Sequence, residues 1–505
     1  MQRKPSLAAL AAVVCLALVA SFPAAAQDLA TFEKNLTLET LDNGLTVIVY
    51  ERPQAPVVSF FTHVDVGSAQ EVPGITGLAH MFEHMAFKGT SVVGTNDYKA
   101  ERKAIEKVDR AYAALDAERR KSGGSDEATL AELQEEFEAA QKEAEEFVTK
   151  NEFGEIIDRA GGVGLNAFTN ADTTGYHYSL PANKVELWAY LESERFLDPV
   201  YRQFYKERDV VQEERRMRTE SQPIGPLIEA FQSAAFTAHP YGHSTVGHMS
   251  DLKSFTRKDA HDFYKTYYVP SNITVAVVGD IKAKKVVPIL KRYFSRLPEG
   301  PPPPPVRTVE PPSISEKVIT IPDPSQPVYV EGYHRPAGDH PDDAIYNAMA
   351  DVLSTGRTSR LYRSLVRDKK IAAFSGAFNG FPGTKYPTLM ILFGVTTPGH
   401  TNEEIRDAIR AEIERIKTEP VSDEELRKVK TRAKAGLIRG LASNGGLAGQ
   451  LATFQGQRGD WRELFHRVER IERVTAEDIL RVAQATFVPK NRTVAMIVNE
   501  DSDSN

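Results

Sequence analysis

The chain has 505 residues, of which 41% are hydrophobic and 26% are charged, and its net charge at pH 7 is −7. This length exceeds what one hydrophobic core usually serves, so the sequence predicts two or three domains. There is no basic excess that would favour nucleic acid as a main partner. The only cysteine, Cys15, lies near the N-terminus, so the remainder of the chain can form no disulfide and offers no thiolate to a metal.

The first 26 residues have the composition of a signal peptide for export. Arg3 and Lys4 precede an apolar run over residues 7–20, and alanines at 24–26 provide a cleavage site. The alternative is an N-terminal membrane anchor, but the run is short for a membrane span. We therefore expect residues 1–26 to be removed, which leaves a periplasmic or secreted protein without a membrane span.

A proline-rich segment divides the rest of the chain into two halves. It contains five consecutive prolines at residues 301–305, which favour an extended polyproline conformation and cannot pack as a helix. We interpret residues 291–314 as a linker between domains that span residues 37–290 and 315–499. The acidic end, residues 500–505, is expected to be disordered.

The two halves end in similar sequences. FTRKDAHDFYKTYYVPSNITVAVV at residues 255–278 aligns without a gap to a segment within residues 474–498, at a shift of 219 positions. Thr256 and Thr475 are each followed three residues later by Asp, which is a signal for the start of a helix. A shared register of this length indicates a duplication. We therefore predict two homologous α+β domains, each with an antiparallel-rich sheet packed with helices.

The first domain carries extra material at residues 99–158, which is rich in Glu, Lys, Arg and Ala. Apolar residues recur there at spacings of three and four in two stretches, with Gly123 and Gly124 between them. This pattern predicts two amphipathic helices that pack as an inserted antiparallel hairpin. The hairpin could bind a partner or guard an entrance, or it could be a solvated extension without a further role.

The segment GLAHMFEHMAFKGT, residues 77–90, has the composition of a catalytic metal site. On a helix, His80 and His84 are one turn apart, and Glu83 lies on the same side. Two imidazoles at this spacing can reach one Zn²⁺, which polarises a scissile carbonyl and lowers the pKa of water. A nearby carboxylate takes the proton from the attacking water and can deliver it to the leaving amine. The segment therefore predicts a zinc metallopeptidase with Glu83 as the catalytic base.

Catalytic zinc usually has three protein ligands, and without cysteine the third must be a carboxylate or another histidine. The best segment is FYKERDVVQEERRMRTE at residues 204–220, in which Glu207 and Glu214 are seven positions apart. Val210 and Val211 are expected on the same helical stripe. Carboxylates on an apolar stripe are costly unless a metal or a histidine compensates them. A surface helix with scattered charges is the alternative.

A second histidine pair, His239 and His243, has the same spacing as the first. Pro240 and Gly242 lie between the two histidines, so a regular helix is not expected there. We interpret both as loop or structural histidines.

The chain resembles the pitrilysin (insulinase) family of metallopeptidases, the inverzincins. It is most similar to half-length bacterial members akin to the subunits of the mitochondrial processing peptidase. The resemblance rests on HMFEH at residues 80–84, NAFT at 166–169, ERDVVQEE at 207–214 and the duplicated domain ends. It covers nearly all of the chain that follows the predicted signal peptide.

The resemblance implies one Zn²⁺ per chain, bound by His80, His84 and Glu214. It implies that Glu83 is the general base and that Glu207 supports a ligand histidine as its hydrogen-bond partner. The distance in sequence between the histidines and Glu214 is longer than is usual in the family, and the inserted hairpin accounts for the excess.

The family fold implies two domains that face each other as a half clam shell. Asn166 and Ala167 match an edge strand that pairs with an extended or unfolded substrate. Arg367 matches a residue that holds the substrate near the zinc. The family tyrosine seven positions after this arginine is replaced here by Phe374, so this substrate contact is incomplete.

We expect a zinc-dependent endopeptidase that acts on peptides or unfolded polypeptides and forms a homodimer or a heterodimer with a related subunit. Phe374 motivates the alternative of a zinc-bearing subunit that needs a second family member for activity. A further alternative is a vestigial peptidase that serves as a binding protein.

Overall fold

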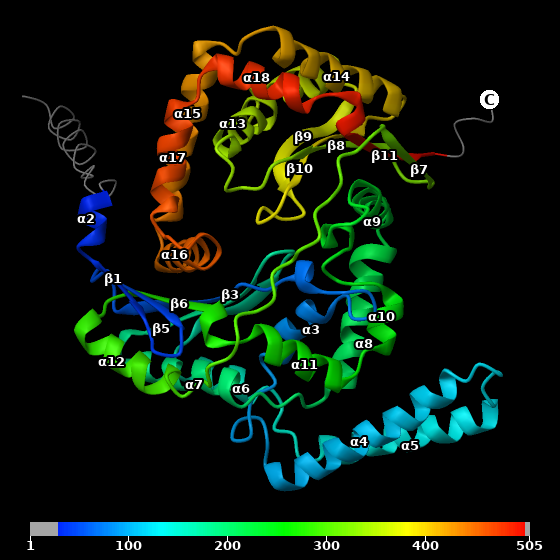
Figure 1. The fold of residues 1–505 in the computed structure, drawn as a ribbon, viewed down its shortest axis with the longest axis vertical. Coiled ribbons are helices and arrows are strands. Elements are labelled where there is room, and N and C mark those ends of the chain that lie inside the picture. Colours follow the sequence, from blue (N-terminus) through cyan, green and yellow to red (C-terminus); the bar gives the residue numbers. More distant parts are fainter. Residues whose placement is uncertain (1–28, 500–505) are drawn as a thin grey trace, which may run out of the picture.

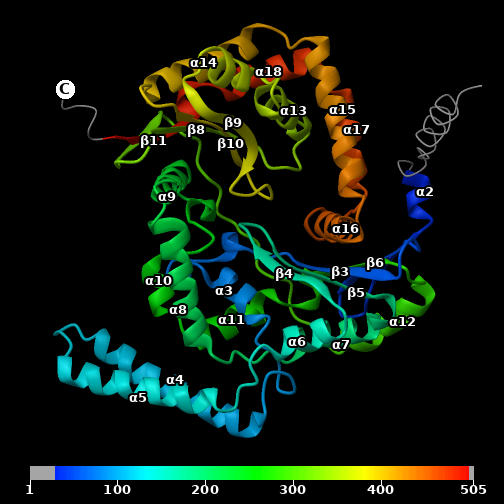
Figure 2. The ribbon, with the colours of Figure 1, turned by 180° about the vertical axis from the view of Figure 1, so that it is seen from behind.

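Two β-sheets, one in each half of the chain, organise the structure. The computed structural model describes residues 29–499, so the predicted signal peptide and the predicted tail at 500–505 lie outside the described residues. Helices cover the outer face of each sheet, and the inner faces are turned towards each other (Figure 1; Figure 2 shows the reverse side). The predicted α+β fold of two homologous domains in a half clam shell is confirmed.

The first domain contains a six-stranded sheet with the order β1-β2-β6-β3-β5-β4. Its strands are β1 (Leu36–Thr40), β2 (Thr46–Glu51), β3 (Val57–Val64), β4 (Val163–Thr169), β5 (Thr174–Pro181) and β6 (Ile273–Gly279). Its helices are α2 (Leu29–Glu33), α3 (Leu78–Met85), α4 (Tyr98–Arg119), α5 (Glu127–Glu145), α6 (Glu152–Arg159), α7 (Val185–Leu197), α8 (Phe204–Arg215), α9 (Ile224–Ala235), α10 (Met249–Ser254), α11 (Arg257–Tyr267) and α12 (Ala283–Phe294).

The second domain contains a five-stranded sheet with the order β7-β11-β8-β10-β9. Its strands are β7 (Lys317–Pro322), β8 (Val328–Arg335), β9 (Ala372–Phe381), β10 (Thr388–Thr396) and β11 (Arg492–Val498). Its helices are α13 (Asp343–Ser354), α14 (Asn402–Thr418), α15 (Asp423–Gly440), α16 (Asn444–Arg458), α17 (Glu463–Arg473) and α18 (Ala476–Thr486). Among residues 29–499, no helix is both long and apolar enough to cross a membrane.

Corresponding elements of the two domains are related by the shift of 219 positions. α11 and α18 differ by this shift at both ends, and so do β6 and β11. The side chains of Thr256 and Thr475 each accept a hydrogen bond from the backbone N–H three residues later, so α11 and α18 begin in the same way. In each sheet one pair of neighbours is parallel, β2 with β6 and β7 with β11. The predicted duplication is therefore present in the fold.

Each domain places one helix on the inner face of the other domain's sheet. α16 of the second domain packs on β3 and β6, and α9 of the first domain packs on β7 and β11. Apolar side chains fill both contacts, with Phe61 and Leu451 in one and Phe231 and Ile497 in the other. Burial of apolar surface contributes most of the favourable free energy of such association. The contacts of α16 and α9 therefore hold the two domains together.

Hydrogen bonds and an ion pair also join the two domains. The carboxylate of Asp172 accepts hydrogen bonds from the backbone N–H groups of Thr384 at 2.7 Å and Lys385 at 3.1 Å. The ammonium group of Lys385 pairs with Asp65 at 2.6 Å. These contacts tie one loop of the second domain to the sheet of the first.

Gly456 lets α16 lie very close to β3. A Cβ atom at this position would be 2.1 Å from Cδ2 of His63, whose ring is fully buried. We expect Gly456→Ala to destabilise the fold by about 1–3 kcal/mol, because overpacking forces neighbours to shift. Thermal unfolding measures the effect. The matched control is Gly436→Ala on α15, where a Cβ atom meets nothing within 4 Å; equal unfolding midpoints for the two variants would contradict the expected clash.

The inserted hairpin consists of α4 and α5 and projects from the first domain (Figures 1 and 2). Gly124 has a φ of 89° in the turn between the two helices. The predicted range of 99–158 is too long, because α5 ends at Glu145 and α6 is a separate helix. Asn151, with a φ of 54°, interrupts the helical backbone before α6, and Phe153 of α6 is buried in the core of the first domain.

The chain between the domains forms neither helix nor strand over residues 295–316. The predicted start of the linker at residue 291 is wrong, because α12 continues to Phe294, whose side chain is fully buried. Glu310 accepts a hydrogen bond from the backbone N–H of His239 at 2.9 Å. Glu310 therefore attaches the linker to the first domain at the segment that follows α9.

Candidate metal centre

α3 carries His80, Glu83 and His84, the three residues of the predicted catalytic motif. The helix begins after Gly77, whose φ of 92° is a backbone conformation that favours glycine. Apolar side chains on the remaining face anchor the helix in the core of the first domain: Leu78, Met81, Phe82 and Met85. The packing thus leaves the histidine face directed away from that core, towards α8.

α8 packs against α3 and places Glu214 next to both histidines. Nε2 of His80 is 3.7 Å from Oε1 of Glu214, and Nε2 of His84 is 3.4 Å from Oε2 of the same carboxylate. One ligand atom from each of the three residues lies within 4.8 Å of the other two. In the part of the chain that the structure describes, this is the one group of three His, Cys, Asp or Glu side chains with such geometry.

The three side chains fit a zinc ion. Two imidazoles and one carboxylate form a common ligand set of catalytic zinc sites, which leave a further position open for water or substrate. Burial, followed by the neighbouring His84, lowers the pKa of His80 to about 4. His80 is therefore neutral at neutral pH, and its ring nitrogen can bind a metal.

Glu207 lies behind His84, on the same helix as Glu214. One carboxylate oxygen of Glu207 is 3.3 Å from Nδ1 of His84, and the other contacts the ammonium group of Lys88. Burial alone would lower the pKa of His84, but the hydrogen bond and charge of Glu207, with the charge of Glu214, raise it overall. A carboxylate on the far nitrogen of a ligand histidine fixes the tautomer and the direction of the ring.

Glu207→Gln is expected to weaken zinc binding by about 10–100-fold, because the carboxylate that orients His84 is lost while the shape is kept. Competition with a chromogenic chelator measures the zinc dissociation constant. Glu213→Gln is the control, because Glu213 is exposed and pairs with Arg216 at 2.8 Å. Unchanged zinc affinity in Glu207→Gln would show that Glu207 does not support His84.

Glu83 lies beside the three predicted ligands and borders the same cavity as His84. Burial raises the pKa of Glu83, and the charge of His84 opposes this rise. The carboxylate is therefore more basic than an exposed one, which suits a group that accepts a proton near neutral pH.

A cavity of about 550 Å³ opens next to Glu83 and His84. Asn166 and Ala167 of β4 line one side, and the segment that leads into α6 lines another. Within the described residues β4 pairs with β5 alone, so β4 is an edge strand of the sheet. Edge strands present backbone N–H and C=O groups that can pair with a further strand.

Arg367 and Phe374 lie in the second domain. Arg367 is in a π-helical turn, Tyr362–Asp368, where its exposed guanidinium pairs with Asp368 at 2.6 Å. Phe374 on β9 is 60% exposed and contacts Phe393. Within residues 29–499, neither Arg367 nor Phe374 lines the cavity beside His84. The structure therefore brings together the predicted ligands, Glu83, Glu207 and the two residues of β4, but not Arg367.

The apolar stripe predicted between Glu207 and Glu214 is wrong at one position. Val211 is fully buried, whereas Val210 is 46% exposed. α8 turns towards the core the face that carries Phe204 and Val211, and Val210 falls beyond the edge of this face. The two carboxylates lie at the border of the buried surface, which is where they can reach α3.

Two basic residues at the cluster were not predicted from the sequence. Lys88 contacts Glu207, and the guanidinium of Arg218 lies 2.5 Å from Oε1 of Glu214. Arg218 follows Glu214 by four positions, a spacing at which helical side chains are neighbours, so this spacing was the available signal for Arg218. Lys88 lies beyond the end of α3 and reaches Glu207 on α8, a contact that spacing in the sequence does not indicate.

His239 and His243 flank a short 3-10 turn, Pro240–Gly242, as expected from the intervening proline and glycine. His239 accepts a hydrogen bond from the backbone N–H of Tyr241 at 3.1 Å, and His243 contacts Glu71 at 3.1 Å. Both therefore have structural contacts, in agreement with the interpretation from the sequence.

Comparison with known proteins identifies relatives of this chain. The sequence profile described as Insulinase (Peptidase family M16) matches residues 46–117, and that described as Peptidase M16 inactive domain matches residues 254–433. Zinc protease PqqE of Helicobacter pylori is 28% identical over 479 residues, which cover 91% of each chain. A protease structure from Helicobacter pylori is 26% identical, with a TM-score of 0.76 over 92% of this chain and 99% of that one. The periplasmic protease PqqL of Escherichia coli is 19% identical, with a TM-score of 0.68 over 95% of this chain and 48% of that one.

The fold and the His–Glu cluster in its first domain define a two-domain peptidase of the metal-dependent class. The chain belongs to the insulinase family, peptidase family M16. Relatives named zinc proteases support zinc as its metal. In the second domain, Leu426 and Ala433 stand at the positions on α15 that correspond to Glu207 and Glu214, so the ligand helix of the first domain has no acidic counterpart there.

Proposed function

We propose that this protein is a zinc-dependent endopeptidase that hydrolyses peptides or unfolded polypeptides. The observation that carries the proposal is the convergence of His80, His84 and Glu214 within 4.8 Å of one another. A separate, half-buried carboxylate, Glu83, borders the same cavity as an edge strand. This arrangement combines a metal site, a base and a surface that can bind a peptide backbone.

His80, His84 and Glu214 would hold the zinc. When bound, Zn²⁺ acts as a Lewis acid that polarises the scissile carbonyl and lowers the pKa of a water molecule. Glu83 takes the proton from the attacking water and passes it to the leaving amine. Glu207 keeps the ring of His84 in the required tautomer while these proton transfers take place.

Asn166 and Ala167 would bind the substrate by adding it to β4 as a further strand. Strand addition uses backbone hydrogen bonds, so it requires an extended segment and depends weakly on sequence. A folded substrate cannot present such a segment without local unfolding. The geometry therefore supports peptides and unfolded polypeptides as the substrate class.

A second subunit would complete the substrate site. Phe374 is 60% exposed and Phe378 is 44% exposed, and both lie on the edge strand β9 of the second domain. Exposed aromatic side chains of this kind are typical of interaction surfaces. We propose a homodimer or a heterodimer with a related chain, in which a second domain from the partner contacts the substrate. The predicted signal peptide, with a similar fold in a periplasmic protease, supports export to the periplasm or beyond.

A digest of a peptide library by the purified chain tests the function, beside measurements of metal content and native mass. We expect about one zinc per chain, cleavage within peptides, loss of cleavage on chelation and recovery with added zinc. Cleavage that survives complete removal of zinc would sink the proposal. A zinc-loaded chain that cleaves only after a related subunit is added would instead favour the heterodimer.

A further inference from the structure

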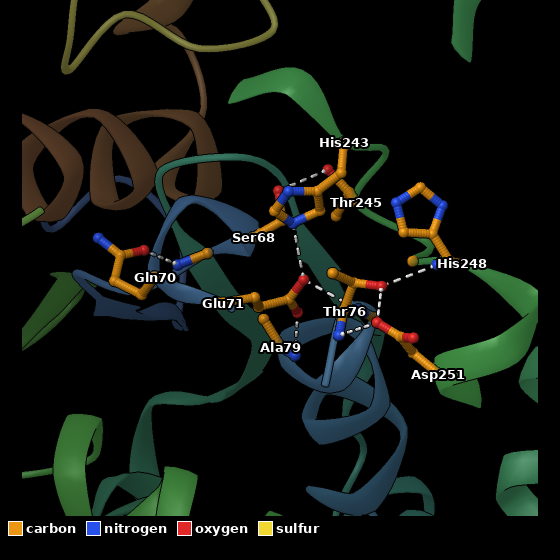
Figure 3. Close-up of polar contacts among 12 residues, drawn as sticks. Ser68, Gln70, Glu71, Thr76, Ala79, His243, Thr245, His248 and Asp251 are labelled. Atoms are coloured by element: carbon orange, nitrogen blue, oxygen red, sulfur yellow. Dashed lines mark hydrogen bonds and ion pairs between the residues drawn. The ribbon is translucent and has the colours of Figure 1, made fainter. Parts of the chain in front are cut away.

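The buried side chain of Glu71 caps the N-terminus of α3, the helix that carries both candidate zinc histidines. One carboxylate oxygen of Glu71 accepts a hydrogen bond from the backbone N–H of Gly77 at 2.8 Å, and the other accepts one from Ala79 at 2.7 Å (Figure 3). The Glu71 side chain is 0% exposed. A carboxylate at a helix N-terminus satisfies its free N–H groups and favourably opposes the helix dipole, so Glu71 fixes where α3 begins.

His243 pairs with this carboxylate from the segment that follows α9. Nε2 of His243 is 3.1 Å from Oε2 of Glu71, and its side chain is 12% exposed. Burial raises the pKa of Glu71, while the hydrogen bond and charge of His243 oppose the rise. Removing one partner of a buried ion pair strongly destabilises the protein, because the remaining charge is left uncompensated. The buried carboxylate of Glu71 therefore requires His243.

The same segment is also attached to α8, the helix that carries Glu214. Arg215, the residue after this candidate ligand, donates a hydrogen bond to the backbone carbonyl of Gly247 at 2.6 Å. The guanidinium of Arg215 also pairs with Glu229 of α9 at 2.6 Å and 2.8 Å. Residues 243–247 therefore connect α3, through Glu71, with α8, through Arg215.

The backbone of this segment lies directly against the backbone before α3. A Cβ atom on Gly77 would be 2.4 Å from the carbonyl oxygen of Val246, and one on Gly247 would be 2.2 Å from that of Thr76. Both glycines also have positive φ values, 92° and 83°. Because no space separates residues 243–247 from the backbone before α3, a displacement of residues 243–247 must displace the start of α3.

We propose that Glu71 and His243 are positioning residues of the metal centre, which hold α3 in place relative to α8. In this way they set the two histidines against Glu214. The inference rests on the proposed zinc function. Zinc ligands must lie within about 2.0–2.2 Å of the ion, so a small shift of one helix lowers affinity.

Zinc dissociation constants and the visible spectrum of the Co²⁺-substituted protein test the proposal in the full chain. We expect His243→Ala to weaken zinc binding by about 10–100-fold, as is typical for partners behind the ligands, and to change the Co²⁺ spectrum. His243→Gln should recover part of the affinity, because its amide N–H can donate to Glu71. His248→Ala is the matched control. Its ring centroid is 6.4 Å from that of His243, and its recorded contact to Thr76 uses the backbone N–H, which the variant keeps.

Thermal unfolding of the metal-free variants separates positioning from simple stability. A folded His243→Ala variant with wild-type zinc affinity and an unchanged Co²⁺ spectrum would overturn this inference but leave the proposed zinc function intact. A lower unfolding midpoint in that variant would then show only that His243 stabilises the fold. If His243→Ala does not fold, Glu71→Gln, which keeps one acceptor oxygen for α3, is judged by the same two measurements. A wild-type chain without affinity for zinc would overturn the proposed function and this inference with it.

Discussion

Replacing Glu83 by Gln is expected to remove most peptide hydrolysis while leaving zinc bound. Gln has the shape of Glu but cannot take a proton from water, and general bases of this kind contribute about 10²–10⁴-fold to the rate. The predicted ligands His80, His84 and Glu214 are unchanged in the variant, so metal content should stay at the wild-type level. The measurement is kcat/KM for a cleaved peptide, with zinc content determined on the same samples.

The control for this experiment is Glu213→Gln, which removes a carboxylate next to Glu214. Glu213 is exposed and pairs with Arg216, outside the cluster. Both activity and zinc content should therefore match the wild type. Equal activity in Glu83→Gln and Glu213→Gln would exclude Glu83 as the base, whereas loss of zinc from Glu83→Gln would show that Glu83 helps to hold the metal.

The main parts of the candidate metal centre were predictable because they depend on local spacing. His80 and His84 are one helical turn apart, and Glu207 and Glu214 are two turns apart, so each pair shares a face once the helix exists. The duplicated domains were predictable for a similar reason, because the constant shift of 219 positions between the two halves is visible in the sequence itself.

The remaining features depend on tertiary contacts that spacing does not encode. Arg208 and Arg215 are buried in α8 because they find a tyrosine hydroxyl, carbonyl groups and a carboxylate in distant segments. Hydropathy assigns such residues to the surface, which is why the buried face of α8 was misjudged at Val210. The pairing of Glu71 with His243 joins residues 172 positions apart, so neither residue alone indicated a link to the metal.

Glu101→Ala is expected to be strongly destabilising, by about 3–5 kcal/mol, because it leaves a buried cation without its counter-charge. Glu101 on α4 binds Arg202 through two hydrogen bonds, at 2.7 Å and 3.2 Å, and the two side chains are 0% and 1% exposed. Arg202 also donates to the carbonyl groups of Thr90 at 2.7 Å and Val93 at 2.9 Å. This pair therefore fastens the base of the inserted hairpin to the loop that follows α3.

Chemical denaturation of the zinc-free chain measures this loss without a contribution from metal binding. Glu143→Ala is the matched control on the same hairpin, because Glu143 pairs with Lys107 of α4 at 2.5 Å where both side chains are about half exposed. Exposed pairs contribute little, so this variant should unfold like the wild type. If Glu101→Ala unfolds like Glu143→Ala, Arg202 must be satisfied by its carbonyl partners alone. If it unfolds early, this buried ion pair contributes to holding the hairpin on the first domain, and its Arg202 lines the same cavity as Glu83 and His84.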